Sequence, residues 1–224
     1  MGSYSLSGKR CRGFNPKGNT VRPIEKCGSR VLPTLLVLLT LALGMMVSAA
    51  RPAYAADLVV STKAISAPAG FRGVCERYAW ACDRSSKASV HGAEAQLELA
   101  YRVNRAVNRQ VREISDQQQY KQREYWALPT RRGGDCEDFA LLKKRELQRA
   151  GIAPDRLLIA TVLDRRQRAH AVLVLRTDRG DYVLDNLTSR IKPWNKTGYS
   201  FIRMQDPTTP SGWTVVMRGG IFRT

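Results

Sequence analysis

The chain has 224 residues, with 37 Lys and Arg against 19 Asp and Glu, a formal net charge of +18 at pH 7 and 43% hydrophobic residues. This hydrophobic content excludes a charged, disordered polymer, and the length suits one domain with a short additional segment. Apart from Arg131-Arg132 and the run Arg165-Arg166-Gln167-Arg168, the basic residues are scattered. This scatter and the export signal described below argue against a nucleic-acid partner. An acidic substrate, an anionic envelope surface or a well-solvated basic surface would each account for the charge.

Residues 1–55 have the pattern of a basic leader followed by a secretory signal peptide. Residues 32–47 are almost wholly apolar, Arg30 precedes them, and Ala53-Tyr54-Ala55 matches an A-x-A cleavage signal. The apolar run is shorter than the roughly 20 residues of a membrane span. We therefore expect a periplasmic domain of residues 56–224. The alternative is a domain anchored to the membrane by an uncleaved signal.

Two helices are expected in the first half of this domain. An extended arm at 56–69 precedes a long helix at 92–115, and a polar connection at 116–132 leads to a second helix that ends before Gly151. Apolar and core-facing positions of the long helix recur at three- and four-residue steps. They are Leu97, Tyr101, Asn104, Val107, Val111 and Ile114.

The second half of the domain predicts strands rather than helices. Runs rich in β-branched and aromatic residues occur at 156–163, 170–176, 182–184, 199–204 and 213–217. Helices followed by a strand meander indicate an α+β fold. In such a fold the N-terminal helices pack on one face of an antiparallel β-sheet.

Cys75 and Cys82 are seven positions apart in the predicted domain. In an oxidising compartment a local disulfide is one interpretation, and two buried free thiols are the other. A disulfide would leave Cys136 as the odd thiol of the domain, which is what a nucleophile requires.

Cys136 follows the glycine pair Gly133-Gly134 and opens the second predicted helix. The unpaired N–H groups and the positive dipole end of a helix N-terminus favour an anionic thiolate. Asp135 and Asp138 have the spacing of an N-cap residue and its acidic partner three residues later. We therefore interpret Cys136 as a nucleophile.

A nucleophilic thiol needs a base, and the base needs a group that orients it. The chain has only two histidines, and His170 opens a predicted strand while Asp185 closes the next one. If residues 177–180 form the hairpin loop, Asp185 lies opposite Val172, one diagonal step from His170 on the same face. A bulge or a shorter loop would bring the two closer. Cys136, His170 and Asp185 are thus the candidate catalytic residues.

The segments GGDCEDFALLKKRELQRAGI and HAVLVLRTDRGDYVLDN resemble the bacterial transglutaminase-like cysteine peptidases. The similarity extends upstream through VNRAVNRQVREISD and EYWALP, over about residues 70–213. The resemblance implies a transglutaminase/papain-like core with its catalytic triad at Cys136, His170 and Asp185. It also implies cleavage of an exported or surface-anchored protein. An inner-membrane receptor that senses a cyclic dinucleotide and sequesters the protease is the regulatory partner found in this family.

Asp135, Glu137 and Asp138 place three negative charges beside the sulfur, which would raise the pKa of the thiol. Either these carboxylates cap the helix and point away, or a hard cation lies among them, and oxygen ligands suit calcium. The resemblance implies calcium at this motif, with Asp135 and Glu137 as ligands and Asp138 as a less certain third.

Trp126 lies ten residues before Cys136 and either anchors its loop on the core or forms a wall of the thiol's pocket. The backbone N–H of Cys136 is the expected oxyanion donor. We expect an exported, calcium-dependent cysteine endopeptidase acting on a periplasmic or surface-anchored protein. A thiol-dependent deamidase or transamidase is an alternative, because these reactions pass through the same thioester. A catalytically weak, calcium-dependent binding module is another.

Overall fold

The computed structural model describes residues 55–58, 61–85, 91–209 and 211–222. Nearly all of the predicted leader and signal peptide therefore lies outside the described residues. Within the described ranges, no helix combines the length and the apolar character needed to cross a membrane.

Six antiparallel strands form one sheet in the order β4-β3-β2-β1-β5-β6. Their bounds are β1 Leu157–Leu163, β2 Ala169–Thr177, β3 Gly180–Leu184, β4 Lys192–Pro193, β5 Ser200–Gln205 and β6 Trp213–Arg218. The first four strands form a meander, and the chain then crosses back so that β5 pairs with the free side of β1. The predicted antiparallel sheet is confirmed, but β1 lies inside it rather than at the edge that a simple meander would give.

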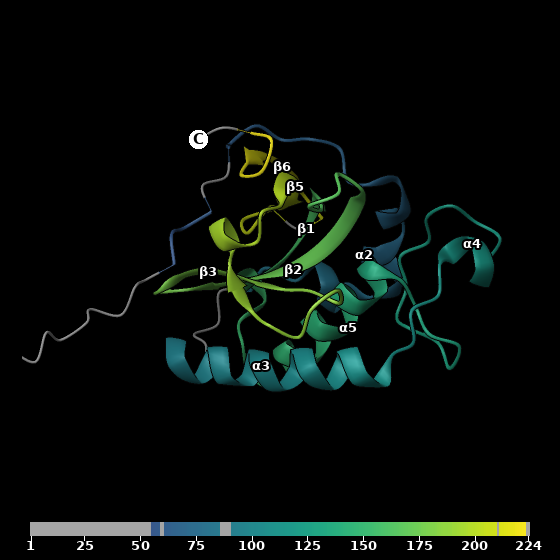
Figure 1. Ribbon diagram of the computed structural model, residues 1–224, viewed down its shortest axis with the longest axis horizontal. Helices are drawn as coiled ribbons and strands as arrows, with labels where there is room; N and C mark the ends of the chain where they lie inside the picture. Colours follow the sequence, from purple (N-terminus) through teal and green to yellow (C-terminus); the bar gives the residue numbers. More distant parts are fainter. Residues whose placement is uncertain (1–54, 59–60, 86–90, 210, 223–224) are drawn as a thin grey trace, which may run out of the picture. The chain divides into compact units, whose positions relative to one another are not determined.

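Helices cover one face of this sheet, which confirms the predicted α+β fold (Figure 1). The α-helices of the described residues are α2 Val74–Arg77, α3 Ala93–Gln110, α4 Asp116–Gln119 and α5 Cys136–Arg149, of which α4 projects to one side, away from the sheet (Figure 1). Helix α5 packs directly on β2 and β1, and α3 packs on α5. The core between α5 and the sheet includes Leu141 and Leu147 from the helix and Ile159 and Leu173 from the strands. This packing brings the start of α5 beside the start of β2.

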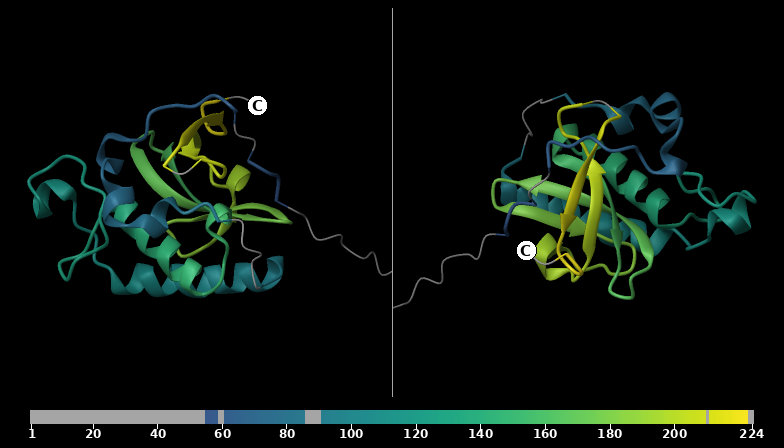
Figure 2. Two further views of the ribbon diagram at one scale, coloured as in Figure 1. Left: turned by 180° about the vertical axis from the view of Figure 1, so that it is seen from behind. Right: turned by 90° about the horizontal axis from the view of Figure 1, so that it is seen from above.

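The opposite face of the sheet carries a second core, which was not expected from the sequence. The extended arm covers it: Leu58 is fully buried, and its N–H donates a 2.7 Å hydrogen bond to Oδ2 of Asp181. The indole of Trp194 donates to the carbonyl oxygen of Ala56 at 2.9 Å. Residues 61–65 then run along β6 through backbone hydrogen bonds (Figure 2). The arm is therefore an integral part of the fold.

Helix α3 ends at Gln110 rather than at residue 115 as predicted. The next residues are extended because they pair with the glycines before α5: Ile114 N–H donates to Gly134 O, and Gly134 N–H donates to Arg112 O. Gly133 has a φ of 126°, and a Cβ there would lie 2.0 Å from Arg112 O. The glycine pair thus allows the close backbone approach that fixes the start of α5.

The buried face of α3 also differs from the predicted stripe. Its buried residues are Gln96, Ala100, Asn104 and Val107. Tyr101, which was predicted to face the core, is 43% exposed. Ala100 is small enough to let α3 approach α5 closely, and the buried Asn104 donates a hydrogen bond to Thr188 O. The polar Asn104 therefore anchors the loop that follows β3.

Candidate active site

Cys136 and His170 line one cavity of about 370 Å³. Cys136 is the first residue of α5, and His170 is the second residue of β2. The cavity is also walled by Trp126 and by Ala171, whose backbone N–H donates a hydrogen bond to the sulfur. The packing of α5 on β2 thus brings together a thiol and an imidazole that are 34 positions apart in the sequence.

The imidazole of His170 also contacts the predicted carboxylate. Nε2 of His170 lies 2.9 Å from Oδ1 of Asp185, which is 3% exposed. Oδ1 also accepts the backbone N–H of Leu187, and Oδ2 accepts the hydroxyl of Tyr199 at 2.5 Å. Burial opposes ionisation of Asp185, but the hydrogen bonds from His170, Tyr199 and Leu187 outweigh it and lower the pKa of Asp185. Asp185 is therefore held as a carboxylate.

The β2–β3 hairpin sets this contact. Thr177 pairs with Gly180, so the turn has two residues rather than the four that were predicted. The register is nevertheless the expected one, because Leu173 pairs with Leu184 and Asp185 follows directly. The diagonal arrangement of His170 and Asp185 follows from this register.

The sequence around Tyr199 predicts only that it belongs to a strand. In the structure its ring packs edge-on against His170, with ring centroids 5.9 Å apart, while its hydroxyl binds Asp185. Asn108 of α3 donates a 2.8 Å hydrogen bond to the backbone carbonyl of Asp185 and fixes it from the other side. No sequence pattern distinguishes these two residues, because each contact joins separate elements.

The thiol itself departs from the sequence prediction. Sγ of Cys136 donates a 3.2 Å hydrogen bond to Oε2 of Glu137. Burial, followed by the negative charge and the hydrogen bond of Glu137, raises the pKa of the thiol well above its ordinary value. The hydrogen bond from Ala171 opposes this rise but is weaker. Without a compensating cation, the thiol is therefore protonated, whereas the helix terminus alone predicts a thiolate.

The predicted capping pair is formed only in part. Asp135 occupies the N-cap position, but its side chain makes no capping hydrogen bond, and its Oδ2 instead accepts the N–H of Asp116 at 3.0 Å. Asp138 is fully buried; its Oδ1 accepts the N–H of Ala127 at 2.8 Å, and its Oδ2 has no hydrogen-bond partner. A Cβ on Gly134 would lie 2.6 Å from Oδ2 of Asp138, so this approach requires glycine.

The carboxylates that gather beside Cys136 are Asp116, Asp135 and Glu137, with oxygen atoms within 4.8 Å of one another. Asp138 is not in this set: its Oδ1 accepts the N–H of Ala127, and its Oδ2 is buried without a hydrogen-bond partner. Asp116, the first residue of α4, takes the third position instead. Its sequence neighbours gave no sign of this, since only the tertiary fold brings α4 to the start of α5.

This acidic cluster has the properties of a site for a hard cation. Oδ1 of Asp116 and Oδ1 of Asp135 are buried and have no hydrogen-bond partner. Burial, followed by the charge of Asp135, raises the pKa of Glu137 to about 10. Adjacent oxygen donors with unsatisfied lone pairs suit calcium, which takes six to eight oxygen ligands. The residues present therefore fit calcium, with backbone oxygens and water needed to complete the coordination.

Trp126 makes contacts of both predicted kinds. It is 2% exposed and packs edge-on against Phe71 and Trp213, and it also lines the cavity of Cys136.

Cys75 and Cys82 form a disulfide, which is the first of the two predicted alternatives. Cys136 is the free cysteine among the described residues.

A cysteine at a helix N-terminus, sharing a cavity with a histidine whose ring contacts a buried carboxylate, is the arrangement of a thiol–imidazole–carboxylate acyl-transfer site. The sequence model of the family of bacterial transglutaminase-like cysteine proteinases matches residues 61–220 of this chain. The chain therefore belongs to this family. Membership supports cysteine peptidase activity in general.

Solved structures of LapG from Legionella pneumophila are similar to this chain. The calcium-bound form is 24% identical with a TM-score of 0.47, covering 59% of this chain and 74% of LapG. The EGTA-treated form is 25% identical with a TM-score of 0.46, covering 54% and 67%. Comparison with curated proteins gave no significant match. With TM-scores below 0.5, the family match alone carries the assignment.

Proposed function

We propose that this protein is an exported, calcium-dependent cysteine endopeptidase that cleaves a periplasmic or surface-anchored protein. Its nucleophile, base and orienting group are Cys136, His170 and Asp185. The observation that carries the proposal is that the thiol of Cys136 shares a cavity with an imidazole whose Nε2 contacts a buried carboxylate. Export rests on the sequence of residues 1–55 alone.

The hydrogen bond between His170 and Asp185 determines how the imidazole acts. Nε2–H donates to Asp185, so Nδ1 is the nitrogen left to take the proton of Cys136. The thiolate attacks the peptide carbonyl, and the backbone N–H of Cys136 stabilises the oxyanion. His170 then protonates the leaving amine, and a water molecule hydrolyses the thioester and restores the thiol. Asp185 stabilises the imidazolium between these steps.

In this proposal Asp116, Asp135 and Glu137 hold calcium. The charge of the ion would offset the field of the carboxylates, which otherwise favours the protonated thiol. Glu137 now accepts the thiol proton in a hydrogen bond, so any interaction that draws Glu137 away frees Cys136 for His170. The acidic cluster thus connects metal binding to the ionisation of the nucleophile.

The test compares cells that carry wild-type protein with cells that carry Cys136→Ala. We expect new N-termini from one or a few surface or periplasmic proteins in the wild type alone, detected by N-terminal proteomics. Deamidated or cross-linked glutamines without new N-termini would instead indicate a deamidase or transamidase. An identical surface proteome in both strains would contradict the protease assignment and favour a binding module.

A membrane receptor that captures the protease is the regulatory partner we propose. Crosslinking in intact cells with Cys136→Ala, followed by affinity purification, tests this separately from proteolysis. Recovery of an inner-membrane protein supports the proposal, and recovery of soluble substrates alone contradicts it.

A further inference from the structure

A second cavity, of about 340 Å³, lies against the other end of the His170–Asp185 pair. Asp185 and Tyr199 line it, whereas His170 lines the cavity of Cys136. Each cavity is thus lined by one member of the hydrogen-bonded pair. The basic side chains around this second cavity, called here the basic cavity, are Arg165, Arg166, Arg168, Arg190 and Lys192.

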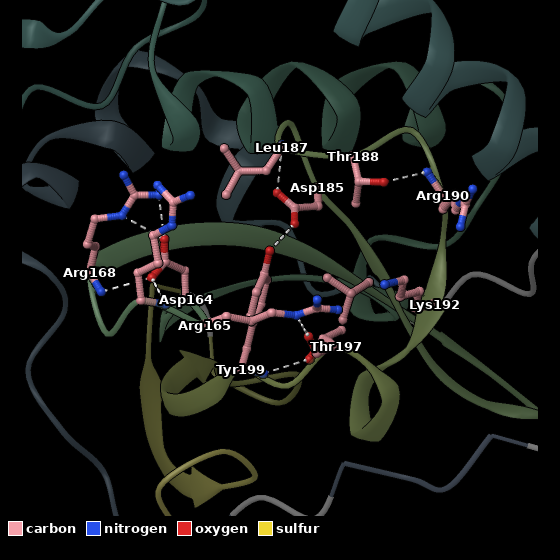
Figure 3. Close-up of a pocket in the computed structure, with 12 residues that line it drawn as sticks. Asp164, Arg165, Arg168, Asp185, Leu187, Thr188, Arg190, Lys192, Thr197 and Tyr199 are labelled. Atoms are coloured by element: carbon pink, nitrogen blue, oxygen red, sulfur yellow. Dashed lines mark hydrogen bonds and ion pairs between the residues drawn. The ribbon is translucent and has the colours of Figure 1, made fainter.

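The basic cavity is built from two loops and the start of β4. Arg168 belongs to the β1–β2 turn, and Arg190 and Lys192 follow β3. Figure 3 shows Arg168 on one side of the cavity and Arg190 and Lys192 on the other, with Asp185 and Tyr199 between them. Positive charges from separate parts of the chain thus converge on one concave surface.

One of these cations is neutralised within the protein. Arg168 forms an ion pair of 2.7 Å with Asp164. The backbone N–H of Arg168, together with its side chain and the N–H of Arg166, lowers the pKa of Asp164 to about 2. Asp164 is therefore ionised, and its charge is committed to Arg168.

The other four cations have no carboxylate partner among the described residues. Asp185, the second carboxylate of the cavity, is already engaged by His170, Tyr199 and Leu187. Nε of Arg165 donates a 2.9 Å hydrogen bond to Thr197 O, which holds that guanidinium in place. The basic cavity therefore has an excess of positive charge that an external anion can compensate.

We propose that the basic cavity binds an acidic segment of the protein substrate, with Asp or Glu side chains a few residues from the cleaved bond. This inference rests on the proposed endopeptidase function and adds a substrate class to it. Concave surfaces with charge of one sign concentrate oppositely charged ligands, and guanidinium groups bind carboxylates through paired hydrogen bonds. An extended polypeptide advances about 3.3 Å per residue, so a chain held at Cys136 reaches past the His170–Asp185 pair within a few residues.

The first experiment measures binding without turnover. Full-length Cys136→Ala protein is titrated with a fluorescein-labelled Glu-rich peptide and with its Gln-substituted counterpart, using fluorescence anisotropy. The double variant Arg166→Glu/Arg190→Glu removes two unpaired cations of the cavity. The matched control is Arg105→Glu/Arg109→Glu, which makes the same charge change at exposed positions of α3 outside the cavity.

We expect the cavity variant to bind the Glu-rich peptide about tenfold or more weakly, and the α3 control to bind it nearly as well as the parent. The affinity should fall with added salt, and the Gln-substituted peptide should bind weakly to all three proteins. Equal losses in both double variants would overturn the proposal, because net charge alone would then explain binding. Cavity-dependent binding of phosphatidylglycerol vesicles without binding of the peptide would also overturn it and indicate a lipid surface.

The second experiment maps cleavage sites of the wild-type protein in a peptide library made from a bacterial proteome. We expect Asp and Glu to be enriched at fixed positions near the cleaved bond, and this enrichment to disappear in the cavity variant. Cleavage without acidic enrichment would refute the basic-cavity proposal but leave the endopeptidase intact. Absence of any cleavage, with cavity-dependent peptide binding retained, would refute the endopeptidase function instead.

Discussion

The hydroxyl of Tyr199 donates a 2.5 Å hydrogen bond to Asp185, the carboxylate whose other oxygen contacts His170. Because Tyr199 also packs against the imidazole, it fixes both members of the pair. A hydrogen bond to a charged group contributes about 1.5–3 kcal/mol. Tyr199 is therefore a positioning residue for the proposed base.

Replacement Tyr199→Phe should lower kcat about tenfold or more with little change in KM. It should also move the acidic limb of the rate profile to higher pH, because loss of this hydrogen bond raises the pKa of Asp185. Peptidase assays across pH test both effects. Tyr182→Phe, which removes a hydroxyl bonded to Arg179 O in the β2–β3 hairpin, is the control and should leave the profile unchanged. A purely structural role would alter stability without moving the profile.

The affinity for calcium should depend on Asp116 more than on Asp138. Asp116→Asn removes a charge from the acidic cluster and should weaken calcium binding about tenfold or more. Asp138→Asn keeps the acceptor for Ala127 N–H and should weaken it less. Isothermal titration calorimetry of chelator-treated protein measures both affinities. If Asp138→Asn weakened calcium binding more than Asp116→Asn did, Asp138 would be the ligand instead of Asp116. If the wild-type protein bound no calcium, the proposed calcium site would be refuted.

The reactivity of Cys136 should report the state of Glu137. Calcium should accelerate alkylation of Cys136 by iodoacetamide near neutral pH, because the ion offsets the carboxylates that raise the thiol pKa. Glu137→Gln should abolish the calcium-dependent acceleration, since the variant lacks the carboxylate that lies in the acidic cluster and contacts the sulfur. Peptide-level mass spectrometry follows Cys136 specifically. If neither calcium nor Glu137→Gln changed the alkylation rate, Glu137 would not control the reactivity of the Cys136 thiol.

The arm should contribute to stability through Leu58. Leu58→Ala removes a fully buried side chain and should lower the free energy of unfolding by about 2–5 kcal/mol. Urea denaturation measures this change, and Ile221→Ala, at a side chain 52% exposed, is the control with an effect of about 0.5 kcal/mol or less. Equal effects of the two variants would mean that the arm does not cover the sheet in solution.

Lys143 should make stability depend on pH. This lysine is buried on α5 near the ring of Phe139, and burial lowers its pKa to about 7. Between pH 7 and the ordinary lysine value the unfolded chain binds more protons than the folded one, so this group makes stability rise with pH. Lys143→Met should therefore stabilise the protein most at pH 7 and below, by about 1–4 kcal/mol.

The gain from Lys143→Met should shrink as the pH rises above 7, because the wild-type lysine is then neutral in the folded state. Thermal unfolding at pH 6.5 and 9.5 measures it, with Lys196→Met as an exposed control. A gain that is constant over this range would show that Lys143 is solvated in the folded protein.

The sequence alone determined the features that depend on local pattern. The helix start at Cys136, the strand that carries His170 and the hairpin register that brings Asp185 beside it follow from periodicity, turn chemistry and the glycine pair. The sheet and its helical cover follow from the order of these elements. A one-residue slip would turn an entire strand face outward, so the hydrophobic pattern specifies the register strongly.

Only the tertiary structure decided the contacts between elements that are distant in the sequence. Asp116 joins Asp135 and Glu137 because the segment after α3 pairs with Gly134, and Tyr199 reaches Asp185 because the chain crosses the sheet before β5. Burial likewise opposes the ionisation that the helix terminus favours at Cys136. A helix terminus is a local property, whereas desolvation and neighbouring charge depend on everything packed around the sulfur.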